Sequence, residues 1–272
     1  MPAYLCTACG IQHPISDEPP PVCILCQDER RAIPREDQRW TSQHSLRHTH
    51  FNAFRRLAPG LMGIATMPVF ALGQRALLVR TPAGNVLWDC PSFLDDATIV
   101  IISALGGVAA IAASCPPSYG AAVEWSHALG SPPVYVHAAD RKFVTRSDPV
   151  VTYWEDEAAT ILPELTLLRC GGQYPGATLL HWAGGAAGEG ALLCGASLRI
   201  ARDGHVRFMR SYDNHVPLDP LSIRHIQAVL EPWAYEAIYG GWWDQVITND
   251  GQKVMFASVE RTIDSLTNPP IS

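Results

Sequence analysis

Short apolar runs, separated by turns rich in glycine and proline, dominate the chain from residue 63 onward. Such runs predict β-strands, and the turn at 81–85 predicts a hairpin between two of them. The segment 95–105 begins with Asp95 and Asp96 and continues with apolar residues three or four positions apart, which predicts a helix. The predicted strands are 63–70, 75–80, 86–89, 108–114, 134–137, 165–168, 178–182, 190–193 and 206–209, and the predicted helices are 95–105, 121–129, 220–230 and 258–266.

The order of these elements favours two β-sheets flanked by helices. Hairpin strands come first, strand and helix units follow, and this succession occurs twice. Because each sheet must cover its apolar face, we predict an α+β protein built in layers. A polar stretch, 27–43, separates the amino-terminal segment from the remainder, so we place a domain boundary near Trp40 and expect domains at 1–40 and 41–272.

Four cysteines near the start predict a structural zinc site. Cys6, Cys9, Cys23 and Cys26 form two Cys-x2-Cys pairs separated by 13 residues. Each pair brings two thiolates from one tight turn to the same ion, and zinc accepts four sulfurs in a tetrahedron. We therefore predict one structural zinc per chain; the alternatives are two disulfides or unpaired core cysteines.

Composition limits the class of protein further. With 272 residues, 47% hydrophobic content and a formal charge of −6, the chain can bury one large core plus a small appendage. No apolar run reaches the length of a membrane helix, and the first residues lack the features of a secretory signal, so we expect a cytoplasmic protein. The acidic charge, without a cluster of lysine and arginine, argues against a nucleic-acid partner.

Several short sequence motifs, taken in order along the chain, resemble those of proteins with the metallo-β-lactamase fold. Within that fold they resemble a group of metallo-hydrolase-like proteins with an amino-terminal zinc ribbon. The resemblance covers nearly the whole chain and implies a four-layer αββα sandwich preceded by a small ribbon. The motifs are 26–30 (CQDER), 59–61 (PGL), 70–75 (FALGQR), 84–90 (GNVLWDC), 104–107 (ALGG), 123–125 (VEW), 137–141 (HAADR) and 180–182 (LHW).

The resemblance also implies a metal centre at the sheet edge, where histidines and a bridging aspartate hold zinc and activate water. A Ser-His-Pro-His motif is expected where this chain has Ser-Cys115-Pro-Pro117. A Gly-Gly-His motif is expected at Gln173, and a Cys-Gly-Asp motif at Ala196. Because only Cys115 retains a strong zinc ligand, we expect that the active-site ligands are lost and that no catalytic metal is bound.

Two residues are candidates for catalysis on such a scaffold. Cys115, at the mouth of the expected pocket, could act as a nucleophile if a base lowered its pKa; the alternative is a small half-buried residue that ends a strand. His181 precedes Trp182 in an apolar strand, where the alternative is a hydrogen bond within the core.

Other polar residues are expected to line the pocket. Asp89, at a strand end, resembles an acidic residue that orients a metal-bound histidine, or else caps the next loop. For His137 and Asp140 the alternative is a hydrogen bond within the core. Tyr119, Gln173 and Tyr174 could line a small-molecule site through hydroxyl and amide donors. The predicted pocket-lining residues are Asp89, Tyr119, His137, Asp140, Gln173 and Tyr174.

Two further clusters have structural explanations. His44, His48 and His50 stand close together, but their spacing favours a linker over a metal site. The aromatic residues from Trp233 to Trp243 are typical of a core or of a subunit interface, so a homo-oligomer is compatible with the sequence.

Three hypotheses for function follow. The first is a degenerate metallo-β-lactamase-fold protein that binds a small organic molecule in the former active-site cleft, with or without a metal-independent step such as cyclisation, elimination or isomerisation. The second is an active metal-dependent hydrolase with a rebuilt centre, for example Cys115 with His137, Asp140 or His181. The third is a non-catalytic subunit that docks a partner enzyme through the ribbon and the aromatic cluster.

Overall fold

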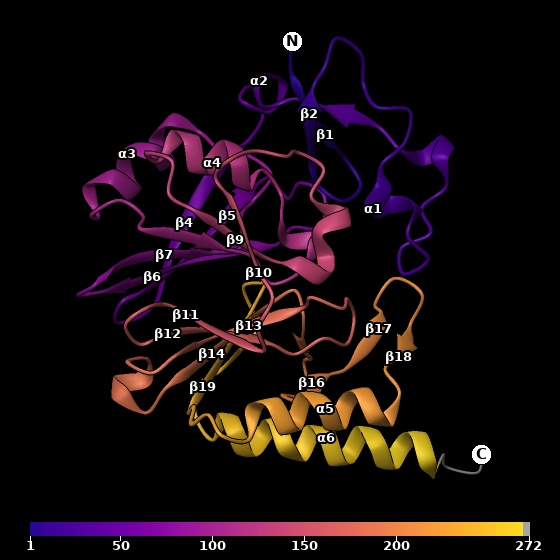
Figure 1. Cartoon of the computed structure of the whole chain (residues 1–272), viewed down its shortest axis with the longest axis vertical. Helices are drawn as coiled ribbons and strands as arrows, with labels where there is room; N and C mark the ends of the chain where they lie inside the picture. The colour runs from indigo at the N-terminus through magenta and orange to yellow at the C-terminus, as the bar shows by residue number, and fades with distance from the viewer. Residues whose placement is uncertain (269–272) are drawn as a thin grey trace.

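Two large β-sheets pack face to face between two layers of helices, and a small sheet lies at the amino end (Figure 1). The structure is a computed structural model and describes residues 1–268. On the outer face of the first sheet lie α3 (Asp96–Ala104) and α4 (Ala122–Ala128), and on that of the second lie α5 (Pro220–Leu230) and α6 (Gly251–Thr267). The predicted four-layer αββα sandwich is confirmed.

The first sheet contains seven strands in the order β10-β9-β8-β7-β6-β5-β4. Strands β4 to β7 form an antiparallel meander, and β7 to β10 run parallel to one another. The strands are β4 (Phe51–Ala58), β5 (Leu61–Met67), β6 (Arg75–Thr81), β7 (Gly84–Trp88), β8 (Ala110–Ala112), β9 (Val134–His137) and β10 (Val151–Trp154).

The second sheet contains six strands in the order β11-β12-β13-β14-β19-β20. These strands are β11 (Ala158–Leu162), β12 (Leu165–Arg169), β13 (Thr178–Trp182), β14 (Ala191–Gly195), β19 (Ala237–Gly240) and β20 (Val246–Ile247). Two short hairpins lie between β14 and α5, and they consist of β15 (Arg199–Ile200) with β16 (Val206–Arg207) and of β17 (Met209–Ser211) with β18 (Val216–Pro217).

The ribbon is a three-stranded antiparallel sheet in the order β2-β1-β3. Its third strand spans Trp40 and Thr41, so the predicted boundary at Trp40 falls inside a ribbon strand. The ribbon and the segment after it comprise β1 (Ala3–Cys6), β2 (Gln12–Ile15), α1 (Ile24–Gln27), η1 (Arg35–Asp37), β3 (Trp40–Thr41) and α2 (Gln43–Leu46).

Local sequence explains where the helices begin. Asp95 accepts a hydrogen bond from the Thr98 amide at the start of α3, and Asp219 accepts one from the Ser222 amide at the start of α5. These carboxylates satisfy amides that have no partner within the helix. The predicted acidic start near residue 95 is therefore confirmed as a helix cap.

The core between the two sheets is apolar. Trp88 and Val79 of the first sheet and Leu165 and Leu180 of the second are all fully buried there. Each such side chain contributes roughly 1.5–3 kcal/mol through burial. Beside this layer, the buried Arg75 donates to the carbonyls of Gly240, Trp243 and Gln245 and so joins β6 to the loop after β19.

Candidate functional site at the ribbon and the sheet edge

The four ribbon cysteines converge as the spacing predicts. Their sulfur atoms all lie within 4.8 Å of one another, and all four side chains are buried. The sulfurs of Cys6 and Cys26 are 3.6 Å apart, close to the separation of two thiolates on one zinc at about 2.3 Å each. Gly10 has φ +82, and a Cβ there would meet Ser92 at 2.1 Å, so the first turn requires glycine. The cluster fits one metal ion.

A second candidate site lies at the edge of the sheets, where three of the four positions at which the resemblance implies metal ligands meet. Pro117, Gln173 and Ala196 line one small cavity of about 10 Å³. Cys115 is nearby in sequence but fully enclosed. The cavity is lined by Arg30, Arg31, Leu72, Gln74, Pro117, Gln173, Ala196, Arg199, Tyr212 and Asp213.

An adjoining cavity of about 20 Å³ shares Leu72, Gln74 and Pro117 with the first. Phe70 and Pro91 add apolar surface, and Cys9 of the ribbon contributes to the wall. We refer to the two cavities together as the sheet-edge cleft. Its walls therefore come from both the ribbon and the sandwich.

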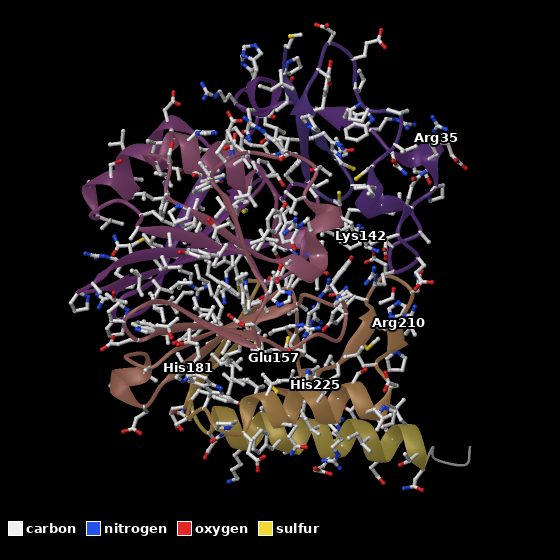
Figure 2. All side chains as sticks on the ribbon, in the orientation of Figure 1. Arg35, Lys142, Glu157, His181, Arg210 and His225 are labelled. Atoms are coloured by element: carbon white, nitrogen blue, oxygen red, sulfur yellow. The ribbon has the colours of Figure 1, made fainter. Side chains whose placement is uncertain are left out.

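The ribbon segment 28–31 reaches into this cleft. Arg30 forms a double ion pair with Asp28, donates to the carbonyl of Gln173 at 2.8 Å, and stacks 4.1 Å from the ring of Tyr174. Ser211 on β17 donates to the Arg30 carbonyl at 2.6 Å. The loop after α1 accordingly approaches the β17–β18 hairpin (Figure 1), close to the labelled Arg210 in Figure 2.

A buried hydrogen-bond network forms the floor behind Pro117. Asp89 accepts from the Ser114 amide at 2.7 Å and from its hydroxyl at 3.1 Å, and that hydroxyl accepts from the Ala196 amide at 3.1 Å. Burial raises the pKa of Asp89 to about 7. Burial also raises the pKa of the Cys115 thiol far above its usual value, so Cys115 is an enclosed thiol rather than a thiolate.

Asp140 is a second buried carboxyl, on the η3 segment (Ala138–Phe143). Neither of its oxygens, nor the Tyr174 hydroxyl, has a hydrogen-bond partner among residues 1–268. Burial raises the Asp140 pKa to about 6, although the Gly176 amide and Arg30 oppose the shift. His137 lies at the start of the same η3 segment, and its ring packs edge-on to that of Trp154 with the ring centres 4.6 Å apart.

His181 does not join these groups. Its Nε2 atom lies 2.8 Å from the carbonyl of Ala234, and its ring packs 4.9 Å from that of Trp233. Thr178, at the other end of β13, is the residue of this strand that meets the cleft network, through Ser197. The label in Figure 2 accordingly places His181 on the second sheet, away from the ribbon.

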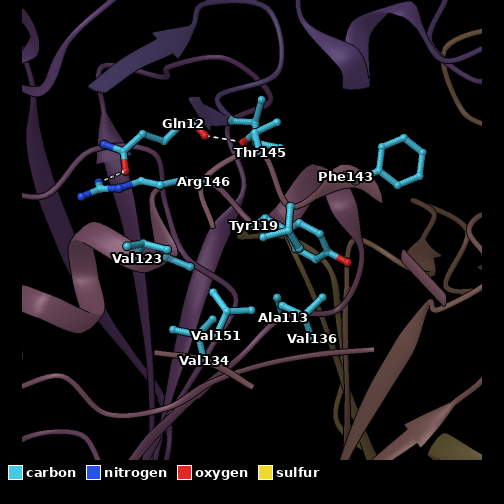
Figure 3. A pocket seen from close by; sticks show the side chains of 14 residues that line it. Gln12, Ala113, Tyr119, Val123, Val134, Val136, Phe143, Thr145, Arg146 and Val151 are labelled. Carbon is cyan, nitrogen blue, oxygen red and sulfur yellow. Dashed lines mark hydrogen bonds between the residues drawn. The ribbon is translucent and has the colours of Figure 1, made fainter. Parts of the chain in front are cut away.

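A separate apolar cavity of about 30 Å³ lies between the ribbon and the first sheet (Figure 3). Tyr119 and Val123 line it from the α4 side. At its rim Gln12 of β2 accepts hydrogen bonds from Thr145 and Arg146, which are drawn as dashed lines. Tyr119 is thus placed at the junction between the ribbon and the sandwich rather than among the residues of the sheet-edge cleft.

Sequence reasoning did not identify the cationic residues of the cleft. Arg30 belongs to the motif 26–30, one of those on which the resemblance rests, but no pattern in the adjacent sequence indicates that it is a site residue. Arg199 and Tyr212 come from the short hairpins after β14, which have no motif. These residues meet only through the packing of the ribbon against the hairpins.

Within residues 1–268, the ribbon cysteines are the one group of three or more His, Cys, Asp or Glu side chains whose ligand atoms lie together. The residues given as an example of a rebuilt hydrolase centre, Cys115 with His137, Asp140 or His181, do not form such a group of three or more. The described residues also contain no helix with the length and apolar character needed to span a membrane.

The architecture and the layered sheets define a metallo-β-lactamase fold, and solved structures share it. The chain is similar to VMB-1 (TM-score 0.59, 10% identity, 79% of this chain and 98% of that chain). It is similar to the metallo-β-lactamase DIM-1 (TM-score 0.58, 12% identity, 78% and 98%) and to the mono-zinc form of the metallo-β-lactamase FIM-1 from Pseudomonas aeruginosa (TM-score 0.57, 13% identity, 78% and 96%).

At the level of sequence, no family model matches the chain. It is 37% identical over 262 residues to the uncharacterized protein YmaE of Bacillus subtilis strain 168, an alignment that covers 95% of each chain. The chain belongs to the same family as YmaE.

Proposed function

We propose that this protein is a degenerate metallo-β-lactamase-fold protein that holds a structural zinc in its ribbon and binds a small organic molecule in the sheet-edge cleft. The observation that carries the proposal is the meeting of Pro117, Gln173 and Ala196 in one cavity. At the positions where the resemblance implies metal ligands, the cleft offers an amide and apolar groups. The residues present do not fit a two-zinc centre.

A metal-independent step in this cleft needs a group that exchanges a proton near neutral pH. Asp140 suits this role better than Cys115 or His181, because its carboxyl has a pKa of about 6 and two oxygens without partners among the described residues. In an isomerisation the carboxylate would take a proton from one substrate carbon and return it to another. Arg30 lines the cleft, stacks on Tyr174 and opposes the raised pKa of Asp140 by its charge, so we expect the substrate to displace Arg30 in order to reach Asp140.

The test is to block the cleft in the full-length protein. Ala196 is 4% exposed and lines the cleft, whereas Ala83 lies exposed in the β6–β7 turn. We expect ligands found by ligand-observed NMR in a library of small organic molecules to bind the native protein and Ala83→Leu equally. Ala196→Leu, if folded by circular dichroism, should abolish binding.

Two results would contradict the proposal. One is binding that is unchanged in a folded Ala196→Leu variant, because the ligand would then lie elsewhere. The other is a second zinc per chain, found by elemental analysis, together with hydrolysis that chelators inhibit while the ribbon remains folded. That result would favour the rebuilt hydrolase centre.

A further inference from the structure

Three buried polar atoms at the sheet-edge cleft lack a hydrogen-bond partner among the described residues. They are the Nε atoms of Arg31 and Arg199 and the Oε1 atom of Gln173. The side chain of Arg31 is only 8% exposed and Gln173 is 9% exposed. Because a buried polar group without a partner costs free energy, such a cluster in one cavity indicates a place for a polar ligand group.

Arg199 is held rigidly there. Its guanidinium lies 4.0 Å from the ring of Tyr212 and 4.3 Å from that of Trp242. The Tyr212 hydroxyl is fixed in turn, since it accepts from the Arg199 amide at 3.1 Å and donates to the Arg207 carbonyl at 2.9 Å. No carboxylate among residues 1–268 forms an ion pair with Arg199. An arginine fixed between two rings is well suited to bind a planar carboxylate.

The other charges at the cleft are largely matched. Asp28 pairs with Arg30, and Asp213 lies 3.4 Å from a terminal nitrogen of Arg31. The charge of Asp140 acts on Arg30, whose pKa it helps to raise. Arg199 therefore remains the cation at the cavity wall without an ion pair among residues 1–268, and Arg31 still offers its unpaired Nε atom.

We propose that the ligand of the sheet-edge cleft is a small organic acid whose carboxylate is bound by Arg199 and Arg31, with the Gln173 amide hydrogen-bonded to the same or an adjoining polar group. This inference rests on the proposed function, because it assigns a chemical class to the ligand of that cleft. The apolar part of the acid would lie against Phe70, Leu72 and other residues of the adjoining cavity.

Size favours a carboxylate over a phosphate. The cavity beside Arg199 measures about 10 Å³, which holds about one water-sized group. A planar carboxylate needs less room there than a tetrahedral phosphate. The adjoining cavity measures about 20 Å³, so entry of the rest of the ligand requires the shared wall at 72–74 to move.

The test is isothermal titration of the full-length protein with acetate, lactate, malate and succinate, beside the neutral analogue succinamide and inorganic phosphate. We expect at least one carboxylate to bind and succinamide to bind at least about tenfold more weakly, since charge-assisted hydrogen bonds are lost. Arg199→Gln should weaken carboxylate binding by about tenfold or more, and Arg199→Lys by less. Arg202→Gln removes the same charge from an exposed position nearby and should change nothing.

The outcomes separate this inference from the function on which it rests. If no carboxylate binds, or if Arg199→Gln and Arg31→Gln both bind carboxylates normally, the assignment to organic acids is wrong. Binding of neutral molecules that Ala196→Leu abolishes would in that case still support the proposed function. Binding of phosphate without any carboxylate would overturn the choice of carboxylate, and failure of every small molecule to bind would overturn both proposals.

Discussion

The ribbon cluster and the sheet-edge cleft differ in how their residues are assembled. The four cysteines come from two short turns, and their sulfur atoms lie within 4.8 Å of one another. The cleft takes residues from the ribbon, the 72–74 loop, the segments after β8, β12 and β14, and the two short hairpins. The first site has four ligands of one type in one place, whereas the second has arginines, aromatic rings, a carboxylate and the two side-chain amides of Gln74 and Gln173.

This difference teaches what each site can bind. Thiolates at close range form a closed coordination sphere, and such sites contribute to folding rather than to chemistry. The cleft has its polar atoms on separate elements that converge on one cavity, which is typical of ligand sites.

The largest effect is expected at the ribbon. Cys26→Ser should reduce the zinc content from about one per chain to near zero and unfold the ribbon, because metal binding supplies on the order of 10 kcal/mol to comparable small sites. Elemental analysis and circular dichroism measure both effects. Cys194→Ala, a buried cysteine of the second sheet, should keep the zinc. If the Cys26→Ser variant kept its zinc, the metal would lie outside the ribbon. The ribbon cluster and the sheet-edge cleft would then not differ in metal binding as stated above.

At the cleft floor, Asp89→Asn should alter the dependence of stability on pH. Burial raises the pKa of Asp89 to about 7, so this carboxyl favours folding below about pH 4 and opposes it progressively as the pH rises toward 7. Asparagine tolerates the φ of +63 at this position. Between pH 4 and 7 the unfolding free energy of the variant should therefore fall by a few kcal/mol less than that of the native protein. Urea unfolding at several pH values measures this, and identical slopes would contradict it.

A smaller effect is expected where the ribbon enters the cleft. Arg30→Ala removes the bond to the Gln173 carbonyl and the stacking on Tyr174, and should reduce stability by about 1–3 kcal/mol. Hydrogen exchange should become faster in residues 28–31 while the sheet core keeps its protection. Arg35→Ala, at an exposed ribbon position, serves as the control. Equal exchange in the two variants would mean that the ribbon and the cleft are not coupled through Arg30.

The smallest effect concerns the apolar cavity of Figure 3. Val123→Ile adds one methyl group to a cavity of about 30 Å³ and should raise the unfolding free energy by up to about 1 kcal/mol. Val100→Ile makes the same change at a position that is 67% exposed and should have no effect. A destabilised Val123→Ile variant would show that the ribbon junction is already fully packed.

The fold could be predicted largely from the chain itself. Strands β9 and β13 and helix α5 have the predicted bounds, because each is a continuous apolar or periodic run with clear ends. Strand β4 was missed because it is an edge strand that carries exposed arginines and an exposed Phe51. Helix α6 begins at Gly251, seven residues before its predicted start, because it opens with a glycine and Asp250 before it forms no side-chain capping hydrogen bond that would mark the start in the sequence.

The sites were predictable to different extents. The ribbon cysteines follow from spacing alone, since ligands in sequence-local pairs meet wherever the chain forms the turns. The cleft residues Arg31, Arg199 and Tyr212 meet through long-range packing, which leaves no periodic trace in the sequence. Cys115 and His181 remain predictions as catalytic residues, although burial of the former and the Ala234 contact of the latter favour structural roles.

The path from Cys26 to Arg30 is only four residues long, so one wall of the cleft is tied directly to the metal-binding turn. A fragment that begins at Trp40 would retain the sandwich but lose Arg30, Arg31 and the Cys9 wall, and its cleft would lie open to water. The ribbon thus forms part of the sheet-edge cleft and is not a separate appendage. Any experiment on the cleft therefore needs the ribbon and the sandwich in one chain.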